Sequence, residues 1–89
     1  MVTKRDPRHN VLKLRTLELF ERSGPIRPAE YMVRARFYPI QAADAYLRRL
    51  ARMGLLTRAK DAGGHYLYML SDRGTERLAW LRSQRFLSG

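Results

Sequence analysis

The spacing of apolar residues changes at Gly54, and no other feature constrains the fold of this chain as strongly. Before this glycine, apolar side chains recur every three or four residues, which predicts a helix over residues 39–53 with one buried stripe. The stripe consists of Ile40, Ala43, Leu47 and Leu50. Glycine suits the left-handed position that ends many helices. We therefore expect a helix to stop at Gly54 and a different type of structure to follow.

The segment after Gly54 predicts a β-hairpin. Residues 55–60 read as a short strand, and residues 65–70 alternate strictly between two faces. One of these faces carries Tyr66, Tyr68 and Leu70, and we expect it to lie on the core. Between the strands, residues 61–64 (DAGG) have the composition of a tight turn.

Three further helices are marked by their start and stop residues. A helix over residues 8–22 ends at Ser-Gly-Pro, and a helix over residues 28–36 begins at a proline. Ile26 lies between them in a short extended link that predicts a small edge strand. Ser71 can cap a helix over residues 72–85.

The order helix, short strand, helix, helix, strand, strand, helix is that of a winged helix-turn-helix domain. We therefore predict an α+β, mainly helical fold with a three-helix core, a two-stranded β-wing and a C-terminal helix. Residues 8–89 form this single domain, and residues 1–7 form a short basic arm.

The charge balance favours a polyanionic partner. The 89 residues include 18 Lys and Arg against 8 Asp and Glu, a net charge of +10, which attracts nucleic acid first, then acidic membranes or proteins. There is no cysteine, the two histidines are far apart, and no nucleophile has an evident base. We expect no metal, no cofactor and no enzymatic activity. No apolar run has transmembrane length, so we expect a cytoplasmic, nucleoid-associated protein.

Two segments carry a resemblance to a known class of regulators. Residues 46–56 (YLRRLARMGLL) look like a recognition helix that ends in a Gly-Leu-Leu step into a wing. Residues 68–74 (YMLSDRG) are similar to the Tyr-x-Leu-Thr-x-x-Gly segment that closes the wing and opens the next helix. With these segments, residues 28–81 resemble winged-helix regulators of the MarR and PadR type. The resemblance implies a transcriptional regulator that binds double-stranded DNA.

A helix-turn-helix places its second helix in the major groove, so residues 39–53 are the expected reading element. Gln41 can pair with an adenine edge and Arg48 with a guanine edge, while Ala42 and Ala45 permit close approach. Asp44 can accept from cytosine or pair with Arg48 four residues on. Further candidate contacts lie on the helix over residues 28–36, in the turn after it, on the reading helix and on the wing: Arg34, Arg36, Tyr38, Arg49, Arg52, Arg58, Lys60 and His65.

Two other functions remain open at this stage. A winged-helix domain can serve as a protein interaction module without DNA binding, and exposed aromatic residues can stack on RNA or single strands. Apolar residues beyond the needs of a small core also predict a dimer or partner surface on the first and last helices. Its residues are Leu12, Leu19, Trp80 and Leu87.

Overall fold

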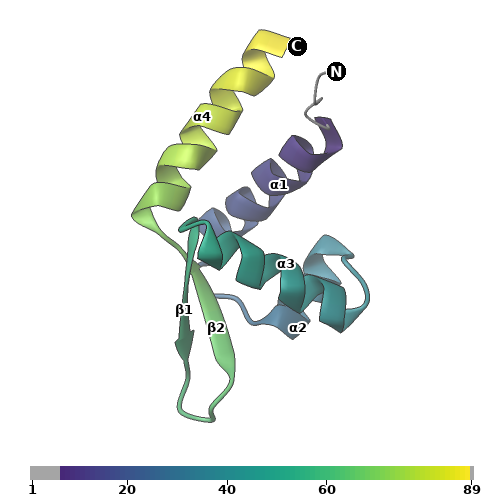
Figure 1. The fold of residues 1–89 in the computed structure, drawn as a ribbon, viewed down its shortest axis with the longest axis vertical. Helices are drawn as coiled ribbons and strands as arrows, with labels where there is room; N and C mark the ends of the chain where they lie inside the picture. The colour runs from purple at the N-terminus through teal and green to yellow at the C-terminus, as the bar shows by residue number, and fades with distance from the viewer. Residues whose placement is uncertain (1–6, 89) are drawn as a thin grey trace.

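A computed structural model describes residues 7–88, with side chains described for residues 10–84. The elements are α1 (Pro7–Ser23), α2 (Pro28–Ala35), α3 (Ile40–Arg52), β1 (Leu56–Lys60), β2 (Tyr66–Leu70) and α4 (Asp72–Ser88) (Figure 1). This order confirms the α+β, mainly helical fold with a winged helix-turn-helix layout. Pro7, assigned by the sequence to the basic arm, already belongs to α1, and the arm's residues 1–6 lie outside the described part.

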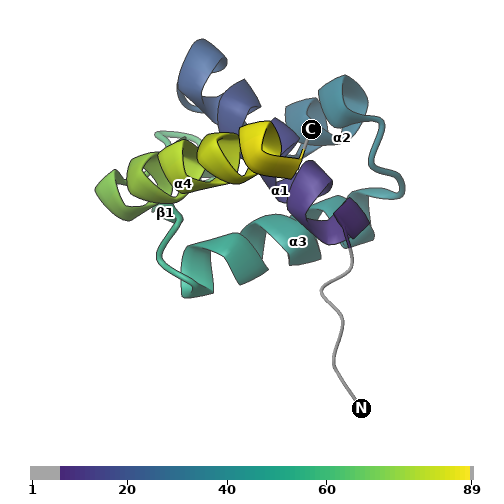
Figure 2. The same ribbon diagram turned by 90° about the horizontal axis from the view of Figure 1, so that it is seen from above.

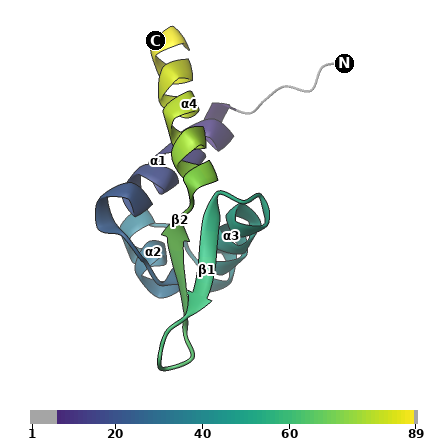
Figure 3. The ribbon, with the colours of Figure 1, turned by 90° about the vertical axis from the view of Figure 1, so that its left-hand side faces the viewer.

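The helices form two groups around the base of the hairpin. α1 and α4 lie side by side and antiparallel, while α2 and α3 pack together below α1 in the view of Figure 1 (see also Figure 2). The β1–β2 hairpin projects from this body, away from the end where α4 finishes (Figure 3). The projecting hairpin and α3 therefore present neighbouring surfaces to solvent.

The core is built from apolar side chains of all four helices and the base of the hairpin. Leu17, Phe20, Leu47 and Leu50 are fully buried, and Leu78 anchors α4 against them. Burying a side chain of this size stabilises the fold by about 1.5–3 kcal/mol. The buried faces thus set the direction in which each helix turns its polar residues.

The hairpin register places its two tyrosines in different environments. Tyr68 pairs with Arg58 across the antiparallel ladder and is fully buried, and its backbone also exchanges two hydrogen bonds with Ile26. This bridge confirms the predicted extended link at Ile26. Tyr66 was expected on the core face but is 38% exposed, because the hairpin extends beyond the end of the core at that position.

The predicted stripe of α3 is correct for Ala43, Leu47 and Leu50 and wrong for Ile40. Ile40 is 37% exposed because it is the first residue of the helix and lies at the edge of the packed body. Tyr46 is buried instead. Its ring packs on Phe37 and Tyr31, with centroid distances of 5.3 Å and 6.5 Å.

The aromatic cluster contains two buried tyrosine hydroxyls, of which only one forms a regular hydrogen bond. The Tyr31 hydroxyl shares a 2.7 Å hydrogen bond with Thr16 on α1. The Tyr46 hydroxyl makes no hydrogen bond of ordinary geometry with the described residues, although the same Thr16 hydroxyl is close enough to oppose part of the rise in its pKa. Burial raises the pKa of both phenols. A buried polar group is costly only when it is unpaired, so the two hydroxyls contribute to stability with opposite sign.

Replacing each tyrosine by phenylalanine should therefore have opposite effects. Tyr31→Phe removes the partner of a buried threonine hydroxyl and should lower the free energy of unfolding by about 1 kcal/mol. Tyr46→Phe removes an unpaired hydroxyl and should leave stability unchanged or raise it slightly. Urea unfolding followed by circular dichroism measures both. Equal losses in the two variants would contradict the assignment of a partner to Tyr31 alone.

The junction between the hairpin and α4 is held by Ser71. Its hydroxyl donates to the Gly54 carbonyl at 2.6 Å and accepts from the Gly74 amide at 2.9 Å, which confirms its predicted capping role. Gly74 approaches the hairpin so closely that an added Cβ would lie 2.1 Å from the Leu55 carbonyl oxygen. Only glycine fits at this point of the helix.

The variant Gly74→Ala should be destabilised although alanine is the better helix former. Its Cβ meets the rigid backbone of Leu55, and the resulting shift should cost about 1–3 kcal/mol. Gly63→Ala is the matched control, because there the nearest atom is Nδ1 of the exposed His65 side chain at 3.2 Å. Thermal unfolding of both variants checks this. A Gly74→Ala protein as stable as the control would show that the contact is not rigid.

Candidate nucleic-acid interface

The core stripe of α3 turns the opposite face of this helix to solvent. Gln41, Ala45, Arg48 and Arg52 are exposed along this face, as the sequence predicts. Ala42 and Asp44 are half-buried on its two flanks. The small alanine side chains leave room for a close approach of the helix backbone. Together these residues form a continuous strip along α3.

The charges of this strip are only partly compensated within the chain. Asp44 forms an ion pair with Arg48, with 3.2 Å between Oδ2 and Nε, and this is the i to i+4 pairing that the sequence allowed. Arg49 and Arg52 are exposed and form no ion pair with the described residues. The exposed ion pair between Asp44 and Arg48 stabilises the chain by at most about 1 kcal/mol, so Arg48 can exchange Asp44 for another anion.

The strip continues into a groove between α3 and β1. The groove has a volume of about 670 Å³, and Arg48, Arg52 and Arg58 supply its charged lining while no carboxylate lines it. Arg58 comes from the wing and reaches this place because the chain reverses at Gly54, whose φ of 82° requires glycine. We call this hollow the α3–wing groove. Its lining also includes Ala51, Leu56 and Thr57.

Two cations of the wing are held by one aromatic ring. The guanidinium carbon of Arg58 lies 4.2 Å and the ammonium nitrogen of Lys60 lies 5.4 Å from the centroid of Tyr66. Such contacts are attractive because the ring face is electron-rich. Tyr66 thus belongs to the candidate interface, whereas the sequence analysis assigned this residue to the core. The sequence places Tyr66 two residues after Gly64 of the turn, and this position near the hairpin tip was the available signal of its exposure.

The tip of the wing is ordered by Asp61. Its carboxylate accepts from the backbone amides of Gly63 and His65 at 2.8 Å and 3.0 Å, and it also pairs with Arg27. These hydrogen bonds, the His65 amide first, lower the pKa of Asp61. The predicted contact residue His65 is exposed at this tip, and its ring lies 3.8 Å from the same carboxylate.

Two further cations lie near the other flank of α3. Burial, with the nearby charges of Arg77 and Arg49, lowers the pKa of Lys13. Lys13 on α1 therefore lies close enough to Arg77 on α4 and to Arg49 on α3 for the charges to interact. Sequence reasoning could not find this proximity, because residues 13, 49 and 77 are far apart in the chain.

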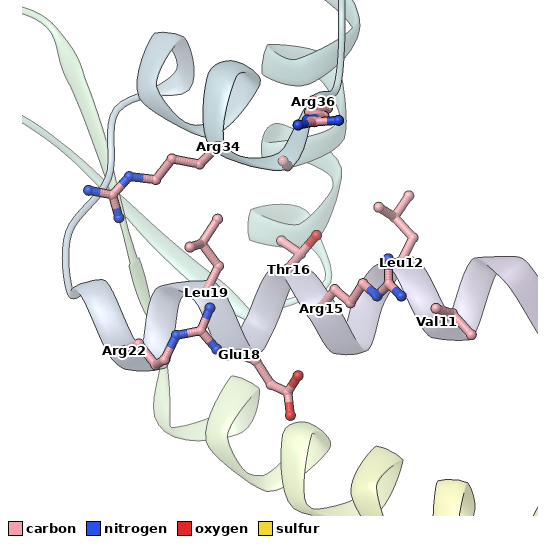
Figure 4. A pocket seen from close by; sticks show the side chains of 10 residues that line it. Val11, Leu12, Arg15, Thr16, Glu18, Leu19, Arg22, Arg34 and Arg36 are labelled. Atoms are coloured by element: carbon pink, nitrogen blue, oxygen red, sulfur yellow. The ribbon is translucent and has the colours of Figure 1, made fainter. Parts of the chain in front are cut away.

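The structure places Arg34 and Arg36 away from the α3–wing groove. Arg34 pairs with Glu30 at 2.8 Å and donates to Ser23, and with Arg36 it lines a separate groove between α1 and α2 (Figure 4). Arg36 ends α2 in the left-handed conformation, with a φ of 53°. Tyr38 follows in the turn before α3 and is 61% exposed.

The residues expected to form a dimer surface lie on α1 and α4. Leu12 and Leu19 line the groove between α1 and α2, whereas Trp80 is 43% exposed on α4 with Arg77 over its ring at 5.4 Å. The side chain of Leu87 lies outside the described residues. The predicted dimer surface therefore stays a prediction.

Comparisons with known proteins find no matching family model, curated protein or solved structure. Within residues 7–88, no helix has the length and apolar character needed to cross a bilayer. Among the described side chains, no group of three His, Asp or Glu residues is placed to hold a metal ion. The candidate site thus rests on its own geometry: a solvent-facing helix, a basic groove and a projecting hairpin.

Replacing Asp61 should loosen the wing tip selectively. In Asp61→Ala the Gly63 and His65 amides lose their acceptor, so their hydrogen exchange should become faster while the amides of α3 stay unchanged. Asp61→Asn keeps an acceptor oxygen and should exchange slowly. In the wild type the order of the tip is present above the ordinary aspartate pKa and lost as the pH falls through the lowered value. Fast exchange in both variants would contradict the role of the turn hydrogen bonds.

Proposed function

We propose that this protein binds double-stranded DNA as a transcriptional regulator, with α3 in the major groove and the wing against the backbone. The observation that carries the proposal is the α3–wing groove, where Arg48, Arg52 and Arg58 from two elements line one hollow. Phosphates need this kind of cationic lining, and arginine can bind them through two parallel hydrogen bonds.

The strip on α3 supplies the residues for reading bases. Gln41 lies in the first turn of α3 and Ala45 one turn later, both exposed. The N-terminal part of a recognition helix is the part that enters the major groove, where an amide side chain can pair with adenine. Asp44 limits the choice of bases, because its carboxylate accepts from cytosine and repels phosphates.

The wing supplies contacts that do not depend on sequence. Arg58 and Lys60 are exposed and stack on Tyr66, and His65 lies at the tip. A hairpin that projects beside the reading helix can reach the backbone flanking the major groove. Arg49 is an exposed cation on α3 that can contact a further phosphate.

The proposal includes a regulator of the MarR and PadR type, as the resemblance of residues 28–81 implies, and a location at the nucleoid. A homodimer would place two α3 helices on successive half-sites and raise the affinity of so small a domain. The single domain alone should bind DNA weakly and with strong salt dependence.

Loss of two arginines should weaken DNA binding only when they lie in the α3–wing groove. We expect Arg52→Ala/Arg58→Ala to bind a random-sequence duplex about tenfold more weakly and to reduce the slope of log affinity against log salt by about 2. Fluorescence anisotropy with labelled duplex at several salt concentrations measures both quantities.

Arg15→Ala/Arg22→Ala is the matched control, since it removes the same charge from exposed residues outside this groove. Equal weakening in the two double variants would mean that net charge alone attracts the duplex. Tighter binding of single-stranded RNA than of duplex, or no duplex binding at low salt, would refute the proposed function.

A further inference from the structure

A second basic groove, between α1 and the end of α2, has no part in the proposed DNA interface. It has a volume of about 550 Å³, and none of its lining residues also lines the α3–wing groove. Its floor is apolar and includes Val11, Leu12, Leu19 and Ala35. Its rim carries Arg15, Arg22, Arg34 and Arg36, whose side chains surround the hollow (Figure 4). We call it the α1–α2 groove.

The rim is positive because little of its charge is compensated. Arg15, Arg22 and Arg36 are exposed and form no ion pair within the described part of the chain. Glu18 is the acidic residue of the lining, and it extends toward α4, where it accepts from Arg82 at 3.2 Å (Figure 4). The groove therefore offers unpaired guanidinium groups beside exposed apolar surface.

This combination selects the chemistry of the occupant. Duplex DNA presents hydrated phosphates and cannot cover an apolar floor without loss of hydration. A second copy of this chain carries the same net charge of +10, and most of its described carboxylates are already held by its own arginines. A segment with apolar side chains on one side and carboxylates on its edges satisfies both the floor and the rim.

We propose that the α1–α2 groove binds an acidic, amphipathic helical segment of another protein. The part of α1 from Val11 to Arg22 that lines the groove is roughly 16 Å long at 1.5 Å per residue, enough for about three turns of a docked helix. Apolar residues at i, i+3 and i+7 of that segment cover Leu12 and Leu19, and flanking carboxylates pair with Arg15, Arg22 and Arg36. The domain thus carries a protein-binding surface apart from its DNA-binding surface.

The test uses a fluorescein-labelled synthetic peptide of leucine, alanine and glutamate arranged as an amphipathic helix. Two peptides serve as controls: one with each glutamate replaced by glutamine, and one with the same composition in scrambled order. We expect the acidic amphipathic peptide to bind measurably more tightly than either control, with affinity that falls as salt rises. Decanoate is titrated separately, because a small amphiphilic carboxylate shares part of this chemistry.

Arg15→Ala/Arg22→Ala should bind the peptide about fivefold more weakly. Arg52→Ala/Arg58→Ala is the matched control and should bind it like the wild type. All four arginines are exposed, so both variants should fold, which circular dichroism checks. Peptide-induced NMR shifts should fall on α1 and the end of α2.

Several results would overturn the proposal. They are equal binding of the scrambled or glutamine peptide, decanoate binding without peptide binding, no peptide binding at millimolar concentration, or equal losses in the two arginine variants. Duplex DNA binding is measured on the same samples and should survive Arg15→Ala/Arg22→Ala. The proposed peptide binding is therefore tested independently of the proposed DNA binding.

Discussion

The arrangement of the molecule depends on one tight contact between the end of α3 and the start of α4. The Ser71 hydroxyl joins the Gly54 carbonyl to the Gly74 amide, the Ser71 amide donates to the Leu55 carbonyl, and Gly74 lies against the same residue. The two strands leave and return through this point. Fixing it sets the angle of the wing against α3 and the position of α4 against α1.

The periodicity of apolar residues in the sequence was sufficient to predict the helices, the strands and most of the core. The apolar stripe of α3, the turn at Gly54, the hairpin and the Ser71 cap each follow from local rules, because each depends on residues close in the chain. Ile40 and Tyr66 were assigned to the core and lie at its edges. A periodic pattern gives the face of a residue but not how far the packed body extends along that face.

Less of the candidate site than of the fold could be predicted from the sequence. Gln41, Arg48 and Arg52 follow from the direction of the core stripe, and their exposure confirms that part. The convergence of Arg58 with them depends on the angle of the wing. The influence of Arg49 and Arg77 on the pKa of Lys13 likewise depends on tertiary structure. Arg34 and Arg36 belong to a different groove because α2 turns them toward α1. Charge is spread evenly along the chain, so only the tertiary packing divides it into separate surfaces.

The stacking of Arg58 and Lys60 on Tyr66 has a consequence for the energetics of the wing. A long cationic side chain loses up to about 2 kcal/mol of rotamer entropy when it is immobilised by a ligand. Here the ring restricts both side chains before any ligand arrives, so part of that loss belongs to folding and not to association. In the proposed DNA complex, side chains restricted in this way would strengthen binding chiefly by slowing its dissociation.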